Sequence, residues 1–306
     1  MINKRLVNTV SESKKYIFGN VLCQWISLLA NILLMYEIAI MLGNLRDARQ
    51  MMITLFVSII ALVLRYICTN ISSKLSYLSS KSVKKKLREM IFEKLYHLGS
   101  SYKEKVNSSE IVQVAVEGVD QLETYFGSYL PQFFYAMLAP LTLFVVLCFV
   151  NVPSAIVLLV CVPLIPITIV IIQKWAKKLL SRYWDQYSEL GDTFLENLQG
   201  LTTSKIYGAD EYKHQEMKKQ SERFRKITMK VLTMQLNSIT IMDIVAYGGA
   251  ALGVILSITQ YRAGNVNLSG CLLIILLAAD FFLPMRMLGS YFHIAMNGMA
   301  ASEKIF

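Results

Sequence analysis

Six stretches of the chain are long and apolar enough to cross a lipid bilayer. A membrane-spanning helix needs about 20 predominantly apolar residues. Hydrophobic residues make up 55% of the 306 residues and charged residues only 17%, whereas soluble domains carry about 25% charged residues. This balance excludes a disordered, collagen-like or ordinary cytosolic protein and predicts an all-α membrane protein. The expected spans are residues 16–42, 51–68, 125–150, 152–172, 234–260 and 268–292.

The positive charges lie mostly on one side of these spans. Lys and Arg number four in residues 1–15, nine in 69–124 and twelve in 173–233, against three in the short turns between spans. Cytoplasmic segments carry an excess of Lys and Arg, so we expect a protein of the cytoplasmic membrane with both termini and both long connections inside. In a soluble chain, 31 Lys and Arg against 21 Asp and Glu would suggest a nucleic-acid partner. Here the expected partner is the lipid bilayer and not nucleic acid.

The two long connections have the pattern of helices rather than loops. No Gly or Pro occurs from residue 64 to residue 98, and apolar residues recur there at helical spacing. Structureless loops of this length are uncommon in compact domains. The spans are therefore expected to continue as helices for about 45 Å into the cytoplasm. They form two hairpins, 69–124 and 173–233, whose tips lie near Gly99 and Gly208.

Motifs for catalysis and metal binding are missing from the sequence. Its three His and five Cys form no H-E-x-x-H or Cys/His metal spacing, and no G-x-S-x-G occurs, so we expect neither an active site nor a metal site in this chain. The cysteines lie in or beside apolar runs, where they are expected to pack as small hydrophobic residues rather than form disulfides. The phosphate-binding pattern G-x-x-x-x-G-K-[ST] is also missing, so ATP hydrolysis cannot be assigned to these residues.

Ionisable side chains inside the spans point to the interior of the bundle. Counting about 1.5 Å per residue from the outer ends, Arg65 lies about 20 Å deep and Asp280 about 18 Å, while Asp243 and Arg286 lie nearer the inner leaflet. A charge at such depth usually faces other helices or a water-filled cavity because exposure to hydrocarbon is costly. Two interpretations stay open. The charges form ion pairs that hold the helices in register, or they line a cavity for an anionic or zwitterionic ligand.

The chain resembles the transmembrane domain of a type I ABC exporter along essentially its whole length. Six spans with two long inner hairpins are the arrangement of that family, and the third span is similar to the CydD subunit of the CydDC transporters. The resemblance implies one transmembrane domain over residues 1–306, with the nucleotide-binding domain either on an excised part or on a separate chain. The segments that carry it are 110–123, 125–135, 194–209, 281–293 and 300–306.

The function that this resemblance implies is that of a permease in a heterodimeric, ATP-driven transporter working by alternating access. Its partners would be a CydC-like half-transporter and nucleotide-binding domains that hold ATP and Mg. The implied substrate is glutathione, cysteine or haem, moved for cytochrome bd assembly. An exporter of lipid, drug or peptide is the alternative within the family. A membrane sensor or assembly scaffold that transports nothing is the alternative from another class.

The resemblance and the buried charges together define two sets of candidate residues. His293 lies seven residues after Arg286 and so shares its helix face; it is either a packing residue or, by the resemblance, a haem ligand. The expected substrate cavity comprises Arg65, Asp243, Asp280, Arg286, Tyr291 and His293. The residues expected to contact nucleotide-binding domains are Ser101, Tyr102, Lys103, Tyr207, Gly208, Ala209, Asp210 and Glu211.

Overall fold

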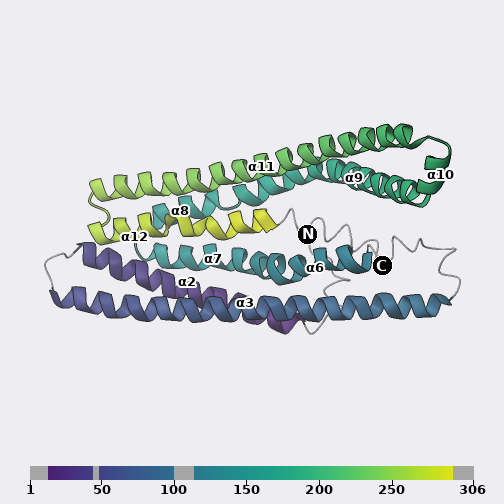
Figure 1. Cartoon of the computed structure of the whole chain (residues 1–306). Helices are drawn as coiled ribbons and strands as arrows, with labels where there is room; N and C mark the ends of the chain where they lie inside the picture. The colour runs from purple at the N-terminus through teal and green to yellow at the C-terminus, as the bar shows by residue number, and fades with distance from the viewer. Residues whose placement is uncertain (1–12, 44–47, 100–113, 292–306) are drawn as a thin grey trace. The chain divides into compact units, whose positions relative to one another are not determined.

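The computed structural model describes residues 13–43, 48–99 and 114–291, and these residues are helical with no β-strand among them (Figure 1). The all-α fold class expected from the sequence is confirmed. The sixth span is interrupted after its first part, and its helix resumes at residues 283–291. In chain order the elements are α2 (Ser13–Gly43), α3 (Ala48–Leu98), η2 (Val114–Gly118), α6 (Val119–Thr124), η3 (Tyr125–Tyr129), α7 (Leu130–Cys148), α8 (Val152–Cys161), α9 (Leu164–Gln199), α10 (Leu201–Ile206), α11 (Asp210–Arg262), α12 (Leu268–Ala278) and η4 (Ala279–Phe281).

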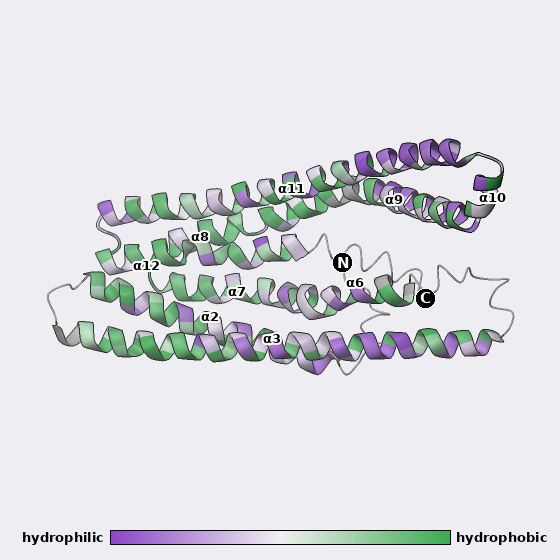
Figure 2. Ribbon diagram, in the orientation of Figure 1, coloured by the Kyte–Doolittle hydropathy of each residue, from purple (hydrophilic) through white to green (hydrophobic). Residues whose placement is uncertain are grey.

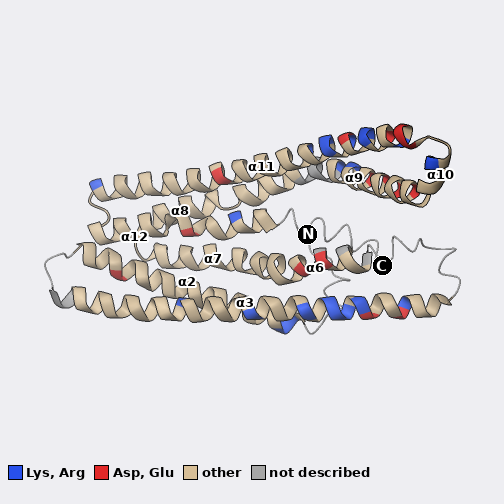
Figure 3. Ribbon diagram, viewed as in Figure 1, with Lys and Arg blue, Asp and Glu red and all other residues tan. Residues whose placement is uncertain are grey.

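Within the part of the chain that the structure describes, six helical segments are long and apolar enough to cross a membrane, as expected. The helix α3 has 51 residues and α11 has 53, which gives about 76 and 80 Å at 1.5 Å per residue, against a hydrocarbon core of about 30 Å. The surplus length is hydrophilic (Figure 2) and carries most of the charges of these two helices (Figure 3). The expected helical extensions are confirmed, while their side of the membrane stays a prediction. The six segments are Ser13–Gly43, Met51–Leu98, Leu122–Cys148, Val152–Ile172, Asp210–Arg262 and Leu268–Tyr291.

The chain divides into two compact units, the first formed by residues 1–165 with 245–306 and the second by residues 166–244. In the first unit α2 packs along α3, and α7 and α12 pack against α2. Its largest fully buried side chains are aromatic and come from the third and sixth spans, which therefore supply much of the core of this unit. These side chains are Tyr125, Phe126, Tyr129, Phe281 and Phe282.

Serines on α3 hold an irregular part of the third span. Residues 125–129 are π-helical, a geometry that departs from the usual backbone pairing and is compensated in membrane helices by Ser and Thr side chains. The Ser76 hydroxyl donates to the carbonyl of Gly127 over 2.6 Å and the Ser80 hydroxyl to that of Glu123 over 3.1 Å. A Cβ at Gly127 would overlap the Ser80 hydroxyl, so the close approach of α3 requires glycine here.

The second unit is a helical hairpin of α9 and part of α11 with the short α10 at its tip (Figure 1). The ring of Phe224 on α11 packs against Tyr183 and Tyr187 on α9, with centroids 5.4 and 5.7 Å apart. Nearer the tip, Lys213 of α11 forms an ion pair with Glu196 of α9 over 3.6 Å. These contacts hold the two arms together and thereby fix the position of α10 within this unit.

Candidate functional site

Asp280 lies where the helix of the sixth span is interrupted. Pro284 has no N–H with which to pair the carbonyl four residues earlier, that of Asp280, and the chain adopts a 3-10 turn over Ala279–Phe281 at this point. The carbonyl of Pro284 accepts a hydrogen bond of 2.9 Å from the Gln132 side chain of α7. The proline therefore explains why an aspartate of this span occupies an irregular position rather than a regular helical turn.

The side-chain amide of Asn31, in the middle of α2, connects Asp280 to Arg65. Its Nδ2 donates to Oδ2 of Asp280 over 2.6 Å, and its Oδ1 accepts from Nη1 of Arg65 over 2.7 Å. Asn31 is only 8% exposed, whereas Arg65 and Asp280 are half-buried. The sequence predicts either an ion pair or a ligand-binding wall here, and the structure places a neutral amide between the two charges.

Tyr135 of α7 completes what we call the Asn31 network: Asn31, Arg65, Asp280 and Tyr135. Its phenol interacts electrostatically with both Arg65 and Asp280. The four residues come from four elements of the first unit, α2, α3, α7 and η4. The network offers a guanidinium, a carboxylate, an amide and a phenol, a set that combines one positive and one negative charge with neutral hydrogen-bonding groups.

The other residues of the expected cavity have different surroundings. The guanidinium of Arg286 lies 5.9 Å from the centroid of the Tyr247 ring, a cation–π contact. Tyr291 is half-buried at the end of the described part of the sixth span. Asp243 belongs to the second unit, and His293 lies outside the described residues. Within the described ranges, no group of three or more His, Cys, Asp and Glu side chains is placed to hold a metal ion.

Sequence reasoning missed Asn31 and Tyr135. The expected cavity rests mainly on charged side chains inside the spans, a criterion that a neutral asparagine or tyrosine in an apolar run does not meet. The available signal was the isolated amide between Ala30 and Ile32, because a buried amide requires hydrogen-bond partners. A search for every polar side chain in the spans would have found it.

The expected coupling residues 207–211 lie at the turn between α10 and α11. Tyr207 is 80% exposed and Ile206 75% exposed, which leaves apolar surface uncovered at the tip of the hairpin. Gly208 has φ of +61°, a left-handed conformation that favours glycine. The expected coupling residues of the first hairpin, Ser101, Tyr102 and Lys103, lie outside the described residues.

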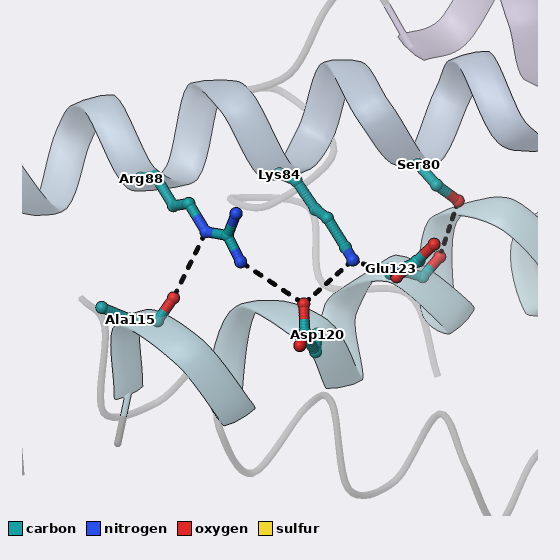
Figure 4. A network of polar contacts seen from close by, with 6 residues as sticks. All are labelled: Ser80, Lys84, Arg88, Ala115, Asp120 and Glu123. Carbon is teal, nitrogen blue, oxygen red and sulfur yellow. Dashed lines mark hydrogen bonds and ion pairs between the residues drawn. The ribbon is translucent and has the colours of Figure 1, made fainter. Parts of the chain in front are cut away.

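A charged cluster ties the hydrophilic part of α3 to the start of the third span (Figure 4). Lys84 forms ion pairs with Asp120, over 2.9 Å, and with Glu123, and Arg88 pairs with Asp120 over 3.5 Å. The hydrogen bond to Glu123, followed by that to Asp120, raises the pKa of Lys84 above its ordinary value. Because Ser80 also binds the carbonyl of Glu123, side-chain and backbone contacts together fix the two segments in register.

Comparison with known proteins agrees with this architecture. Residues 15–285 match the family model of the ABC transporter transmembrane region. A Haemophilus influenzae protein described as an uncharacterized ABC transporter ATP-binding protein is 54% identical, over 82% of this chain and 45% of its own. The Glutathione/L-cysteine transport system ATP-binding/permease proteins CydC of Bacillus subtilis and CydD of Escherichia coli are 26% and 27% identical, over 81% and 85% of this chain and 44% and 45% of theirs.

The chain spans less than half the length of these relatives. Its family match covers most of the 306 residues, and its six apolar helices with long hydrophilic extensions give the match a structural basis. The chain belongs to the ABC transporter transmembrane region family and is a membrane permease of that class.

Proposed function

We propose that this chain is the membrane part of one half of a heterodimeric ABC exporter that moves cysteine or glutathione across the cytoplasmic membrane. The observation that carries this proposal is the Asn31 network, where Arg65 and Asp280 meet in apolar surroundings. Charges at such depth are costly and mark substrate pathways in many membrane proteins. The names of the Bacillus subtilis and Escherichia coli relatives supply the thiol class.

Coupling to ATP would run through the long helices. At about 1.5 Å per residue, roughly 45 Å of α3 and α11 extends beyond the hydrocarbon core. The exposed tip formed by α10 and residues 207–211 is the contact surface for a nucleotide-binding domain in this proposal. Closure of two such domains around ATP and Mg would move the hairpins as rigid levers and alter access to the Asn31 network.

A second half-transporter is the partner that this scheme requires. The relatives CydC and CydD are each named as parts of a transport system, which supports pairing with a CydC-like chain. Haem, bound through Arg286 and His293, is an alternative substrate. A lipid, drug or peptide is another. The thiol is favoured over these because the names of the relatives give that class.

Transport by the assembled complex tests the proposal. The chain is expressed with its nucleotide-binding domain and partner and reconstituted into proteoliposomes. We expect labelled cysteine or glutathione to accumulate when ATP and Mg are supplied outside, and not with ADP. Haem binding, followed by the Soret band, and lipid flipping are measured in parallel. The proposal fails if neither thiol accumulates and neither thiol stimulates ATP hydrolysis. A sensor or scaffold would show no ATP-dependent accumulation of any substrate.

A further inference from the structure

We propose that the Asn31 amide occupies the position of a substrate's free α-amino-acid group, with Asp280 as the site for the ammonium and Arg65 as the site for the carboxylate. The inference rests on the proposed function and adds the part of the substrate that is recognised and the residues that recognise it. Its starting point is the arrangement of one neutral amide between two opposite charges.

The hydrogen bonds of Asn31 have the polarity of an amino acid. Its nitrogen donates to the Asp280 carboxylate over 2.6 Å, and its oxygen accepts from the Arg65 guanidinium over 2.7 Å. An α-amino acid also presents a donor and an acceptor at adjacent positions, an ammonium and a carboxylate. It can therefore make the same two contacts with the same donors and acceptors.

The exchange replaces weaker contacts with stronger ones. Each bond of Asn31 has one ionised partner, whereas a zwitterion would place opposite charges on both sides of each contact, and guanidinium binds carboxylate with two parallel bonds. Because the amide of Asn31 is neutral, it offers neither Arg65 nor Asp280 a group of opposite charge. A zwitterion supplies both, so it competes favourably with the internal amide once Asn31 changes rotamer.

The same geometry disfavours ligands with one charge. An anion beside Arg65 would face the carboxylate of Asp280, and a cation beside Asp280 would face the guanidinium of Arg65; like charges placed together oppose binding. Arg65 and Asp280 are half-buried while Asn31 is buried, so the two charged residues are more accessible than the amide that joins them. Cysteine and glutathione both carry a free α-amino-acid group.

Blocked derivatives of cysteine test the assignment in the complete reconstituted transporter. The probes are L-cysteine, its methyl ester, which lacks the carboxylate, and N-acetyl-L-cysteine, which lacks the ammonium. Each is measured as a competitor of labelled cysteine. We expect both derivatives to bind about tenfold more weakly than cysteine or worse, because each replaces one ionised end of the ligand with a neutral group and so loses the direct pairing of opposite charges. Equal binding of the three probes by the unaltered protein overturns the inference without any variant.

Variants then assign each charge to one end of the ligand. Arg65→Gln should abolish the preference for cysteine over its methyl ester and retain the preference over N-acetyl-cysteine, and Asp280→Asn should do the reverse. Asn31→Ala removes the internal competitor and should leave cysteine binding unchanged or tighter. If instead Arg65→Gln lowers binding of all probes equally, or Asn31→Ala weakens cysteine binding about tenfold, the network is structural and the inference is wrong.

A control lies on the same two helices. Glu37 of α2 accepts a hydrogen bond of 3.3 Å from Thr54 of α3, so Glu37→Gln perturbs another polar contact between α2 and α3 outside the network. It should leave all three affinities unchanged. If the transporter moves a thiol with ATP but binds the three probes equally, this inference is wrong and the proposed function stands. Failure to accumulate either thiol overturns the proposed function, and this inference with it.

Discussion

Replacing Gly249 with alanine is expected to destabilise the protein, whereas the same change at its neighbour Gly248 is not. Both glycines lie in α11. An added Cβ at Gly249 would lie 2.5 Å from Cζ and 2.8 Å from Cε1 of Phe282, whereas a Cβ at Gly248 would meet nothing within 4 Å. The two substitutions are chemically identical, so their difference isolates the helix contact.

The magnitude follows from two opposing effects. Alanine is favoured over glycine within a helix by about 1 kcal/mol, so Gly248→Ala should raise the free energy of unfolding by up to that amount. The Phe282 ring is 1% exposed and has no open space into which to turn, and overpacking of this kind costs about 1–3 kcal/mol. Gly249→Ala should therefore be less stable than Gly248→Ala by about 1–3 kcal/mol.

Thermal unfolding of the purified transporter in lipid nanodiscs measures this difference. The unfolding temperature should be lower for Gly249→Ala than for Gly248→Ala. The double variant Gly249→Ala/Phe282→Leu should recover part of the loss because the smaller side chain leaves room for the new methyl group. Equal unfolding temperatures for the two single variants would refute the packing argument and the closeness of α11 to the sixth span on which it depends.

Three further predictions concern the extensions and the third span. Lys84→Met should lower stability by at most about 1 kcal/mol, because exposed ion pairs contribute little. Folding raises the pKa of Lys84, so this loss of stability should be measurable at neutral pH and should vanish as the pH rises through the raised pKa. Gly208→Ala, in the left-handed turn, should cost about 1–2 kcal/mol and lower the number of substrates transported per ATP. Gly191→Ala, inside α9 with open space around its Cβ, should not destabilise the protein and should leave that number unchanged. Gly127→Ala should destabilise the protein through Ser80, and Ser80→Ala in the same chain should relieve part of that loss, which unfolding of both variants would check.

The long helices could be predicted because simple physical limits determine them. A bilayer requires about 20 apolar residues per span, and the six runs of the sequence meet that requirement. The continuation of α3 to Leu98 follows from the lack of Gly and Pro, since nothing ends the helix where the apolar run ends. These inferences concern one helix at a time and need no knowledge of its neighbours.

The Asn31 network could be predicted only in part because it depends on several helices together. Depth alone places Arg65 and Asp280 at a similar level, but depth does not give the rotation of α2 that brings Asn31 between them. That rotation follows from side-chain packing across the whole of α2 and α3. The sequence therefore indicates which charges are buried, while their partners are determined by tertiary structure.

The serines of α3 show how an unexplained sequence pattern acquires its reason from the fold. Ser72, Ser76 and Ser80 recur every four residues and so lie on one helix face. Ser72 donates to Asn20 of α2 over 2.6 Å, while Ser76 and Ser80 donate to carbonyls of the third span. The carbonyl groups of the π-helical turn require hydrogen-bond donors, and the hydroxyl groups of the serines require acceptors. Neither set is stable in apolar surroundings without the other. A change in register between α3 and the third span would break these bonds together, so the serine face fixes the register of the two segments.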